Sequence, residues 1–545
     1  MFKIIKKLWR LPPFLRTQLT FDSQQNALFQ YFKAMPRQDS FPGRVVMLVQ
    51  CVEDPFYFGL FGQIVFSLRK QQPIRVEQFV LRSLNVGESE SLWIFIKSRF
   101  VLNKLQNHKW VRLYGSFCND VAYRSTSFRP IEDMLDLYRA WACWRNLKDR
   151  KALIDLVIEN IPVGDLINDS FLRFKPAPTI DMGNVYLLVL IWQAYRDVRR
   201  AKDYFERIRP KLFLTSYSTY IQHGIAVRVA LLSGTRVFSF GNFQEVTKEL
   251  TVKDWAHTKN ANTYARDYLK LDNPEEKLTL ADTALSARMA GEIDGATAYM
   301  QKSAYVTSID AVPDVRSALV IFLHDFYDSP HVYREMVFPD FWEWICFTIE
   351  TLNSANLPFF VKPHPNQISL SDGVLSKLKE KYTDICIISS GVTNKQLAET
   401  GMACAVTVYG TVAHEMAYLG VPTIACARHP HVSFDFCRTA THREEYAEML
   451  RSYAVINIDR LQLRQQSLIF YYMHNLNMEE DEKSFKDMVL SFRMDCANPD
   501  ESSQKLIDDL KQITLLSGYK RYISIWLGIL NGAAISGKGL RNGGN

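Results

Sequence analysis

Two short segments of this chain combine residue types that could bind a phosphate group. The first is Lys362 to Pro365 (Lys-Pro-His-Pro), in which prolines restrict the backbone on both sides of His364. A fixed imidazole can donate a hydrogen bond to a phosphate oxygen, and the ammonium of Lys362 adds positive charge. The alternative is a structural turn whose histidine only satisfies a backbone carbonyl. Because the segment directly follows the apolar run Phe359 to Val361, we favour a binding function.

The second segment runs from Tyr409 to Glu415 (YGTVAHE) and leads from an apolar run into a predicted helix. Gly410 permits a ligand to approach the backbone closely. Thr411 and the free N–H groups at the start of the helix could hold an anion. Glu415 lies one turn later and could bind ribose or sugar hydroxyls. The alternative is that Thr411 is only an N-cap and Glu415 only a first-turn acid.

The elements around these segments predict a doubly wound parallel sheet. Apolar runs of strand length alternate with segments of helical periodicity from residue 318 onward. In such a sheet ligands bind beyond the carboxyl ends of the strands, where both segments would lie. We expect strands at 318–323, 358–361, 384–389, 403–408 and 422–425, and helices at 338–352, 372–382, 394–400 and 411–419.

The N-terminal half predicts a second α/β domain. A strand at 44–51, a helix at 56–70 and a strand at 74–81 form one unit, and strands at 211–215 and 236–240 enclose a helix that ends near residue 232. The fold class is therefore α/β, a pair of Rossmann-type parallel-sheet domains. We expect a basic amphipathic segment at 1–42, a first domain at 43–244, a helical insertion at 245–316, a second domain at 317–460 and C-terminal helices at 461–545.

Two residues of the first domain could accept a proton from a reacting hydroxyl. Asp54 follows the first predicted strand, and His223 follows a later one. Each has a structural alternative, since Asp54 precedes a proline and could simply begin a turn, and His223 could be a packed helical residue. Both remain open at this stage.

Further histidines and acids follow strands of the second domain. His324 and Asp325 should border its ligand-binding edge, and His429 should be placed at the rim in the same way. His429 and His431 are close enough in sequence to suggest a metal, but no third ligand stands at a suitable spacing. We therefore expect no metal site and no cofactor.

Composition limits the class of protein. The 545 residues carry a modest net charge of +7, and we expect no nucleic-acid partner. The nine cysteines form no C-x-x-C pair, which favours a reducing cytoplasm. No stretch reaches the roughly 20 apolar residues of a membrane-spanning helix. Residues 1–20 interleave apolar side chains with five cations and contain no acid, as in a segment that lies on an anionic membrane surface. The alternative is a frayed basic terminus.

The two candidate segments and the residues around them resemble the motifs of a known protein family. Trp342 and Trp344 precede the Lys-Pro-His-Pro segment, and Gly-Thr-x-x-x-Glu at Gly410 to Glu415 and Leu-Gly-Val-Pro at 419–422 follow it. About a quarter of the chain in this way resembles bacterial capsule and surface-polysaccharide glycosyltransferases of GT-B architecture, above all the capsule-type Kdo transferases. The resemblance implies that His364 and Thr411 contact the nucleotide phosphate and that Glu415 occupies the family's later acidic position.

The resemblance implies a glycosyltransferase that moves a sugar from a nucleotide-sugar donor, with CMP-linked donors favoured, onto a surface polysaccharide or glycolipid at the inner face of the cytoplasmic membrane. Fixed donors aimed at the leaving phosphate would lower the barrier. The chain lacks an obvious Asp-x-Asp pair at a strand end, which favours a metal-independent, inverting reaction. A nucleotide-sugar epimerase, a CDP-alcohol phosphotransferase and a non-catalytic glycan-assembly scaffold are the alternatives.

Overall fold

The chain forms two compact units. The computed structural model describes residues 19–35, 46–82, 103–125, 129–175, 177–241, 244–292, 311–364, 369–455 and 459–532. Unit 1 comprises residues 1–175, 182–257 and 479–541, and unit 2 comprises residues 176–181, 258–478 and 542–545. The C-terminal segment expected at 461–545 is thus divided at residue 478, and its later helices belong with the N-terminal part of the chain.

Unit 1 is built on a six-stranded sheet of order β3-β2-β1-β6-β7-β8. All neighbouring strands are parallel except β7 and β8, which are antiparallel. The chain adds β2 and β3 on one side of β1 and then returns to add β6 on the other side, so strand order reverses between β1 and β6. The strands are β1 (Val46–Cys51), β2 (Arg75–Val80), β3 (Asp120–Arg124), β6 (Leu212–Thr215), β7 (Arg236–Phe240) and β8 (Thr247–Leu250).

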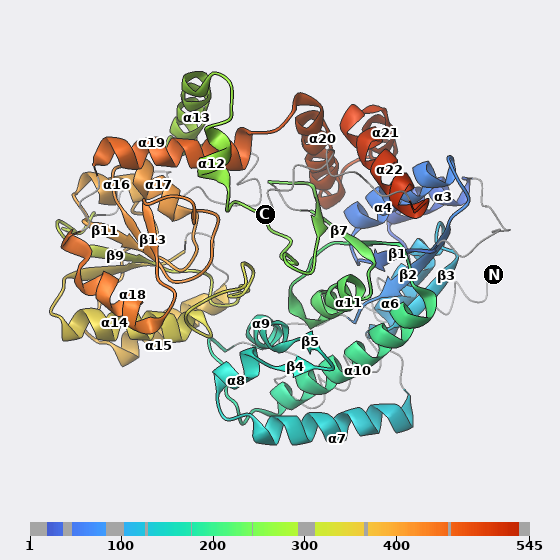
Figure 1. Ribbon diagram of the computed structural model, residues 1–545, viewed down its shortest axis with the longest axis horizontal. Coiled ribbons are helices and arrows are strands. Elements are labelled where there is room, and N and C mark those ends of the chain that lie inside the picture. The colour runs from blue at the N-terminus through green and yellow to red at the C-terminus, as the bar shows by residue number, and fades with distance from the viewer. Residues whose placement is uncertain are drawn as a thin grey trace. The chain divides into compact units, whose positions relative to one another are not determined.

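Helices cover both faces of this sheet (Figure 1). One face packs against α10 and α11, and the other packs against α4 and the C-terminal helices α20 to α22. A short hairpin, β4 (Val157–Ile158) and β5 (Ile161–Pro162), lies outside the main sheet. The helices of unit 1 are α3 (Ser23–Lys33), α4 (Pro55–Arg69), α6 (Asn103–Tyr114), α7 (Pro130–Asn146), α8 (Arg150–Ile154), α9 (Gly164–Phe174), α10 (Val185–Ile208), α11 (Tyr220–Leu232), α20 (Glu480–Ala497), α21 (Ser503–Leu515) and α22 (Ser517–Leu530).

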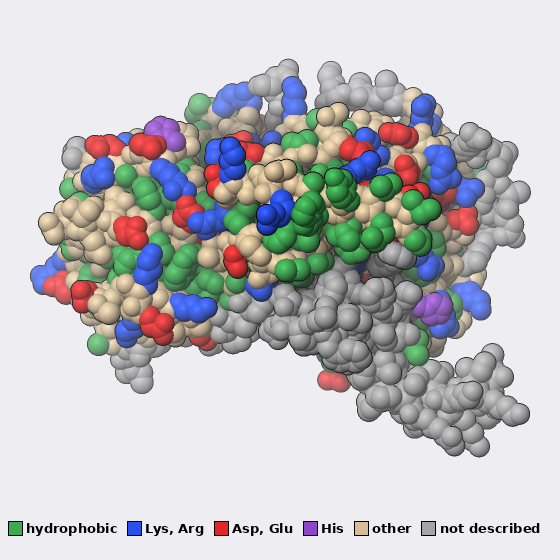
Figure 2. All heavy atoms as spheres, turned by 90° about the horizontal axis from the view of Figure 1, so that it is seen from below, with side chains coloured by type: hydrophobic (Ala, Val, Ile, Leu, Met, Phe, Trp, Pro, Cys, Tyr) green, Lys and Arg blue, Asp and Glu red, His purple; other side chains and the backbone are tan. Residues whose placement is uncertain are grey.

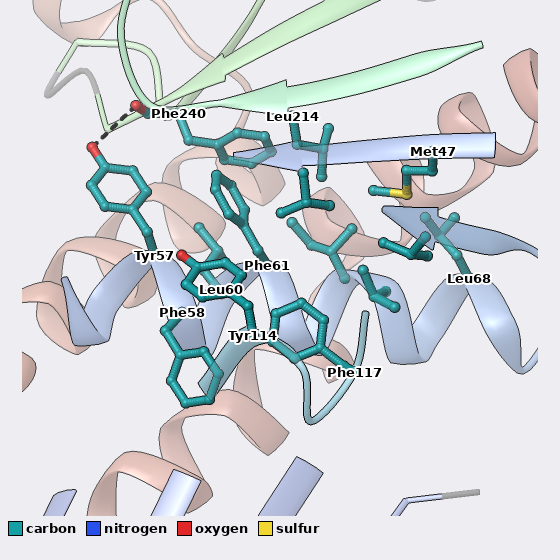
Figure 3. Close-up of a cluster of buried hydrophobic side chains, with 14 of the residues drawn as sticks. Met47, Tyr57, Phe58, Leu60, Phe61, Leu68, Tyr114, Phe117, Leu214 and Phe240 are labelled. Atoms are coloured by element: carbon teal, nitrogen blue, oxygen red, sulfur yellow. Dashed lines mark hydrogen bonds between the residues drawn. The ribbon is translucent and has the colours of Figure 1, made fainter. Parts of the chain in front are cut away.

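The core of unit 1 surrounds α4, which is apolar on nearly every side. In Figure 3, Tyr57 and Phe61 of this helix extend toward the sheet, whereas Phe58 packs against Tyr114 of α6. The Tyr57 hydroxyl donates to the carbonyl oxygen of Phe240 at 3.4 Å, which ties the start of α4 to the carboxyl end of β7. A helix that is apolar all round must be buried, and α4 therefore fixes the strand ends near it.

Unit 2 is built on a five-stranded sheet of order β10-β9-β11-β12-β13, in which every neighbouring pair is parallel. The chain adds β10 on one side of β9 and then β11 on the other side, so strand order reverses between β9 and β11. The strands are β9 (Leu319–Phe322), β10 (Phe359–Lys362), β11 (Cys404–Val406), β12 (Thr423–Ala425) and β13 (Cys437–Thr439).

Alternate residues of β9 face opposite layers of helices, as a doubly wound sheet requires. Leu319 and Ile321 pack against α14 and α18, whereas Val320 and Phe322 pack against α16 and α17. The two-domain α/β fold predicted from the sequence is confirmed. The helices of unit 2 are α12 (Tyr264–Tyr268), α13 (Pro274–Met289), α14 (Phe341–Ser354), α15 (Ser369–Lys381), α16 (Asn394–Glu399), α17 (Val412–Tyr418), α18 (Arg443–Arg451) and α19 (Arg460–Tyr471), with a 3₁₀ turn at Tyr453–Val455 and a π-helical turn at Tyr472–Leu476.

Six strand assignments differ from the sequence expectation, and two of these are the unexpected short strands β4 and β5. Strands β3, β8 and β13 were not expected, and all three contain polar residues and lie at or beside a sheet edge, so they lack a continuous apolar run. The expected strand at 384–389 instead lies beside β10 and pairs through Val361 only. The segment expected as a helical insertion at 245–316 begins with the strand β8.

No helix in the described part of the chain combines the length and the apolar character that crossing a membrane requires. Residues 1–18 of the basic N-terminal segment lie outside the described residues, so the membrane contact expected for residues 1–20 stays a prediction.

Candidate functional site

The two candidate binding segments of unit 2 follow strands on either side of β9. His364 follows β10, His324 follows β9, and Tyr409 to Thr411 follow β11. Because the three strands are parallel, their carboxyl ends meet at one edge of the sheet, at the reversal of strand order. Pro365 lies outside the described residues, and its contribution stays a prediction.

His324 forms a buried support beneath this edge. Its Nε2 lies 3.1 Å from Thr407 Oγ1 and accepts from the backbone N–H of Tyr409 at 3.4 Å, and its ring stacks on Phe341 with centroids 4.9 Å apart. Burial lowers the pKa of His324 to about 3, so the ring is neutral. The rim position expected for His324 is therefore wrong, because the side chain is buried and its hydrogen bonds link the end of β9 to the segment after β11.

His364 is half-buried and lies within electrostatic reach of two carboxylates. Burial lowers the pKa of His364, while Asp325 and Glu415 oppose that shift. Asp325 is itself fixed, because its Oδ1 accepts from Tyr327 N at 3.1 Å and from Ser371 Oγ at 2.9 Å. The histidine of the first segment thus shares a neighbourhood with the acid of the second.

Lys362 points into the protein in this structure. The side chain is buried, and its ammonium donates to the carbonyl oxygen of Val392. Burial lowers the pKa of Lys362 to about 8. Lys362 therefore anchors the segment that leads into α16, and the phosphate contact expected for it stays a prediction.

The Tyr409 to Thr411 turn is held from two sides. The Tyr409 hydroxyl donates to the carbonyl oxygen of Ser329 at 2.9 Å. A Cβ atom at Gly410 would lie 2.9 Å from Thr407 Oγ1, so a larger residue would force a shift there. Thr411 stands at the N-cap position of α17 and is exposed, and its side chain makes no capping hydrogen bond. Its hydroxyl is therefore not occupied by the capping role that the sequence suggested as an alternative.

Glu415 is buried and paired. Its Oε1 accepts from Arg288 Nη2 at 2.6 Å, and its Oε2 accepts from Asn394 Nδ2 at 3.4 Å. Arg288 comes from α13 and Asn394 is the first residue of α16. The sequence did not reveal either partner. Arg288 lies 127 residues before Glu415, and no local sequence pattern links two residues that far apart.

In unit 1, Asp54 occupies the N-cap of α4 at the carboxyl end of β1. Its Oδ1 accepts from the backbone N–H of Phe56 at 2.8 Å, and a proline follows at the first helical position. Burial raises the pKa of Asp54, while that hydrogen bond and Arg493 lower it in part. Asp54 therefore caps a helix, where its structural alternative predicted only the start of a turn, and it is also a carboxylate that is more basic than usual.

His223 is buried on α11 and is poorly suited to accept a proton. Gln50 Oε1 accepts from the backbone N–H of Ser216, so its amide nitrogen must be the atom that faces His223 Nδ1 at 2.8 Å. That contact occupies the Nδ1 lone pair. Burial also lowers the pKa of His223 to about 3. Of the two candidate bases, the hydrogen bonds favour Asp54.

His429 lies in the interior rather than at a rim. Among the described residues, His429, His431 and Cys437 each place a ligand atom within 4.8 Å of the other two, so Cys437 is a third group that sequence spacing did not reveal. However, His429 Nδ1 accepts from His431 N at 2.9 Å, which leaves the proton on Nε2, 2.5 Å from Thr439 Oγ1. Metal-bound histidines donate from the other ring nitrogen. This pattern favours hydrogen-bonded packing, and the absence of a metal stays a prediction.

Comparisons with known proteins found no matching family model and no matching curated protein.

Comparison with solved structures found coarse similarities. A UDP-GlcNAc 2-epimerase from Neisseria meningitidis bound to UDP-GlcNAc has a TM-score of 0.23 and 9% identity, covering 79% of this chain and 98% of the epimerase. The β-Kdo 2,4 transferase KpsC from Thermosulfurimonas dismutans has a TM-score of 0.29 and 12% identity, covering 48% of this chain and 79% of the transferase. The wall teichoic acid polymerase TagF has a TM-score of 0.20 and 10% identity, covering 86% of this chain and 94% of the polymerase.

Proposed function

We propose that this protein is a glycosyltransferase that transfers a sugar from a nucleotide-sugar donor to a surface polysaccharide or glycolipid acceptor. The observation that carries the proposal is the meeting of His364 and the Tyr409–Thr411 turn at the strand-order reversal of unit 2, around the buried His324. This edge is where doubly wound sheets bind nucleotides.

The charges at this edge suit a leaving nucleotide. Glu415 would repel a phosphate if it were unpaired, but its ion pair with Arg288 offsets that charge. A hydrogen bond from His364 and another from the Thr411 hydroxyl would then stabilise charge as it develops on the departing phosphate. In this proposal the donors are fixed before the reaction, and no metal is required.

An acceptor hydroxyl must lose its proton during transfer, and we assign Asp54 to that step. The raised pKa of Asp54 increases its affinity for a proton at neutral pH, whereas His223 has its Nδ1 lone pair occupied.

A thermal-shift screen of CMP, CDP, UDP and GDP with their sugar conjugates tests the donor site, because a ligand that binds the folded state raises Tm. Transfer of labelled sugar from the best donor to a glycan or glycolipid acceptor is the expected second result, unchanged by EDTA. Interconversion of the free nucleotide sugar would favour an epimerase, and release of CMP from a CDP-alcohol would favour a phosphotransferase. A response to no nucleotide would favour a scaffold.

A further inference from the structure

Helix α7 of unit 1 turns its apolar side chains outward. Five large apolar residues lie along one stripe of the helix at spacings of three and four, and each exposes about half or more of its surface. Figure 2 shows hydrophobic side chains gathered on this face of the molecule. The exposed fractions are 80% for Ile131, 59% for Met134, 55% for Leu135, 67% for Tyr138 and 49% for Trp141.

The opposite face of α7 is charged and buried. Asp133 is 0% exposed and pairs with Arg196 and Arg200 of α10 at 3.0 and 3.1 Å. Asp136 is 1% exposed and pairs with Arg199 at 2.7 Å. Surface helices ordinarily bury the apolar face and expose the polar one. In α7 the arrangement is reversed, and ion pairs attach the helix to the protein.

Cations accompany the apolar stripe. Arg145 lies on the line of the stripe, seven residues after Tyr138, and Lys148 follows just beyond the helix end. Both are exposed, and neither forms an ion pair with a residue that the structure describes. Arg129 precedes the helix, but Glu132 and Asp203 pair with it at 3.4 and 3.8 Å. The stripe thus combines apolar and aromatic side chains with cations at its C-terminal end.

This charge pattern distinguishes two candidate partners for the stripe, a second copy of the helix and an anionic lipid bilayer. A second copy of the helix packed in parallel would bring Arg145 against Arg145. An anionic bilayer instead attracts the same cations and takes Tyr and Trp side chains at its interface. We propose that α7 is a membrane-docking helix that lies in the headgroup region of an anionic lipid bilayer.

This inference deepens the proposed function, because a glycolipid acceptor would be presented at such a surface. Its test, however, needs neither donor nor acceptor. The two proposals can therefore fail separately: vesicle binding is measured without nucleotide, and sugar transfer is measured on a soluble acceptor.

The experiment measures co-sedimentation of the full chain with phosphatidylglycerol–phosphatidylcholine vesicles. Lys3, Lys6 and Lys7 are replaced by Glu in every sample, so that the N-terminal segment does not mask binding by α7. In this background, Tyr138→Ser with Trp141→Ser should reduce vesicle binding by about tenfold or more, because apolar contact is lost. Arg145→Glu should reduce binding by about fivefold or more, and only to anionic vesicles.

A matched control removes two exposed leucines from unit 2, Leu269→Ser with Leu461→Ser, which are 83% and 76% exposed. The control should bind vesicles like its parent, and all variants should keep the parent Tm because the altered side chains are exposed. Equal binding by the Tyr138/Trp141 variant and its parent, or no binding by the parent, would overturn the proposal. A halved mass of that variant in sedimentation equilibrium, with vesicle binding unchanged, would identify a second copy as the partner instead.

Discussion

Arg288 and Glu415 form an ion pair in the interior of unit 2, with Arg288 Nη2 2.6 Å from Glu415 Oε1. The side chains are each 6% exposed, so little water can compensate either charge. The pair joins α13 to α17 and sets the charge beneath the candidate nucleotide site.

Replacing Arg288 by Met should destabilise unit 2 by about 3 to 5 kcal/mol, because Glu415 would be left charged and buried. Urea unfolding followed by far-UV circular dichroism measures the change. Arg316→Met serves as the control, since its ion pair with Asp314 is exposed and should contribute little. Equal stability of the two variants would show that the Arg288 pair is not needed.

His364→Ala and Thr411→Ala should each weaken nucleotide binding by about 1.5 to 3 kcal/mol, or more than about tenfold in Kd, because each removes a hydrogen bond to a charged phosphate. Isothermal titration calorimetry with the nucleotide selected by thermal shift gives both values. His442→Ala removes an exposed histidine at the start of α18 and should leave Kd unchanged. Unchanged Kd in both site variants would refute the site assignment.

Asp54→Asn should lower kcat by about 100-fold or more while nucleotide Kd stays the same, because the variant cannot accept a proton. Asn also caps helices, so α4 should remain folded. In the parent protein, kcat should fall as pH decreases through a pKa above the usual aspartate range, since burial raises the pKa of Asp54. Measured pH profiles should lack this acid limb in the variant, and its persistence would assign the limb to another group.

Acid should progressively destabilise the protein below about pH 6.5, because several buried histidines resist protonation. Burial lowers the pKa of His223, His324 and His429 to about 3 and that of His257 to about 4. Their unfolded-state pKa is higher, so the unfolded chain binds protons first. The stabilisation is thus present above pH 6.5 and is lost as pH falls toward 4, by up to about 1.4 kcal/mol per histidine and pH unit.

Urea midpoints between pH 7 and pH 4 measure this loss. His257→Gln should flatten the pH dependence of unit 1, whereas His442→Gln, at an exposed site, should not. A pH-independent midpoint in the parent would contradict the buried, neutral state of these histidines.

The sequence predicted the central strands and the loops after them. Val46–Cys51, Leu319–Phe322 and Phe359–Lys362 all lie within or close to the expected runs, because a parallel strand covered on both faces needs continuous apolar residues. Edge strands such as β3 and β13 need no such run, and this pattern does not detect them.

Tertiary structure decided what the polar residues do. The sequence by itself predicted the order of strands and loops along the chain. The sheet order β10-β9-β11, which brings His364 and the Tyr409–Thr411 turn to one edge, came from the tertiary structure. The sequence did not determine that Glu415 pairs with Arg288, that Gln50 forms a hydrogen bond with His223, or that α7 exposes its apolar stripe. Such contacts join residues far apart in the chain, and burial and pKa depend on those neighbours rather than on local spacing.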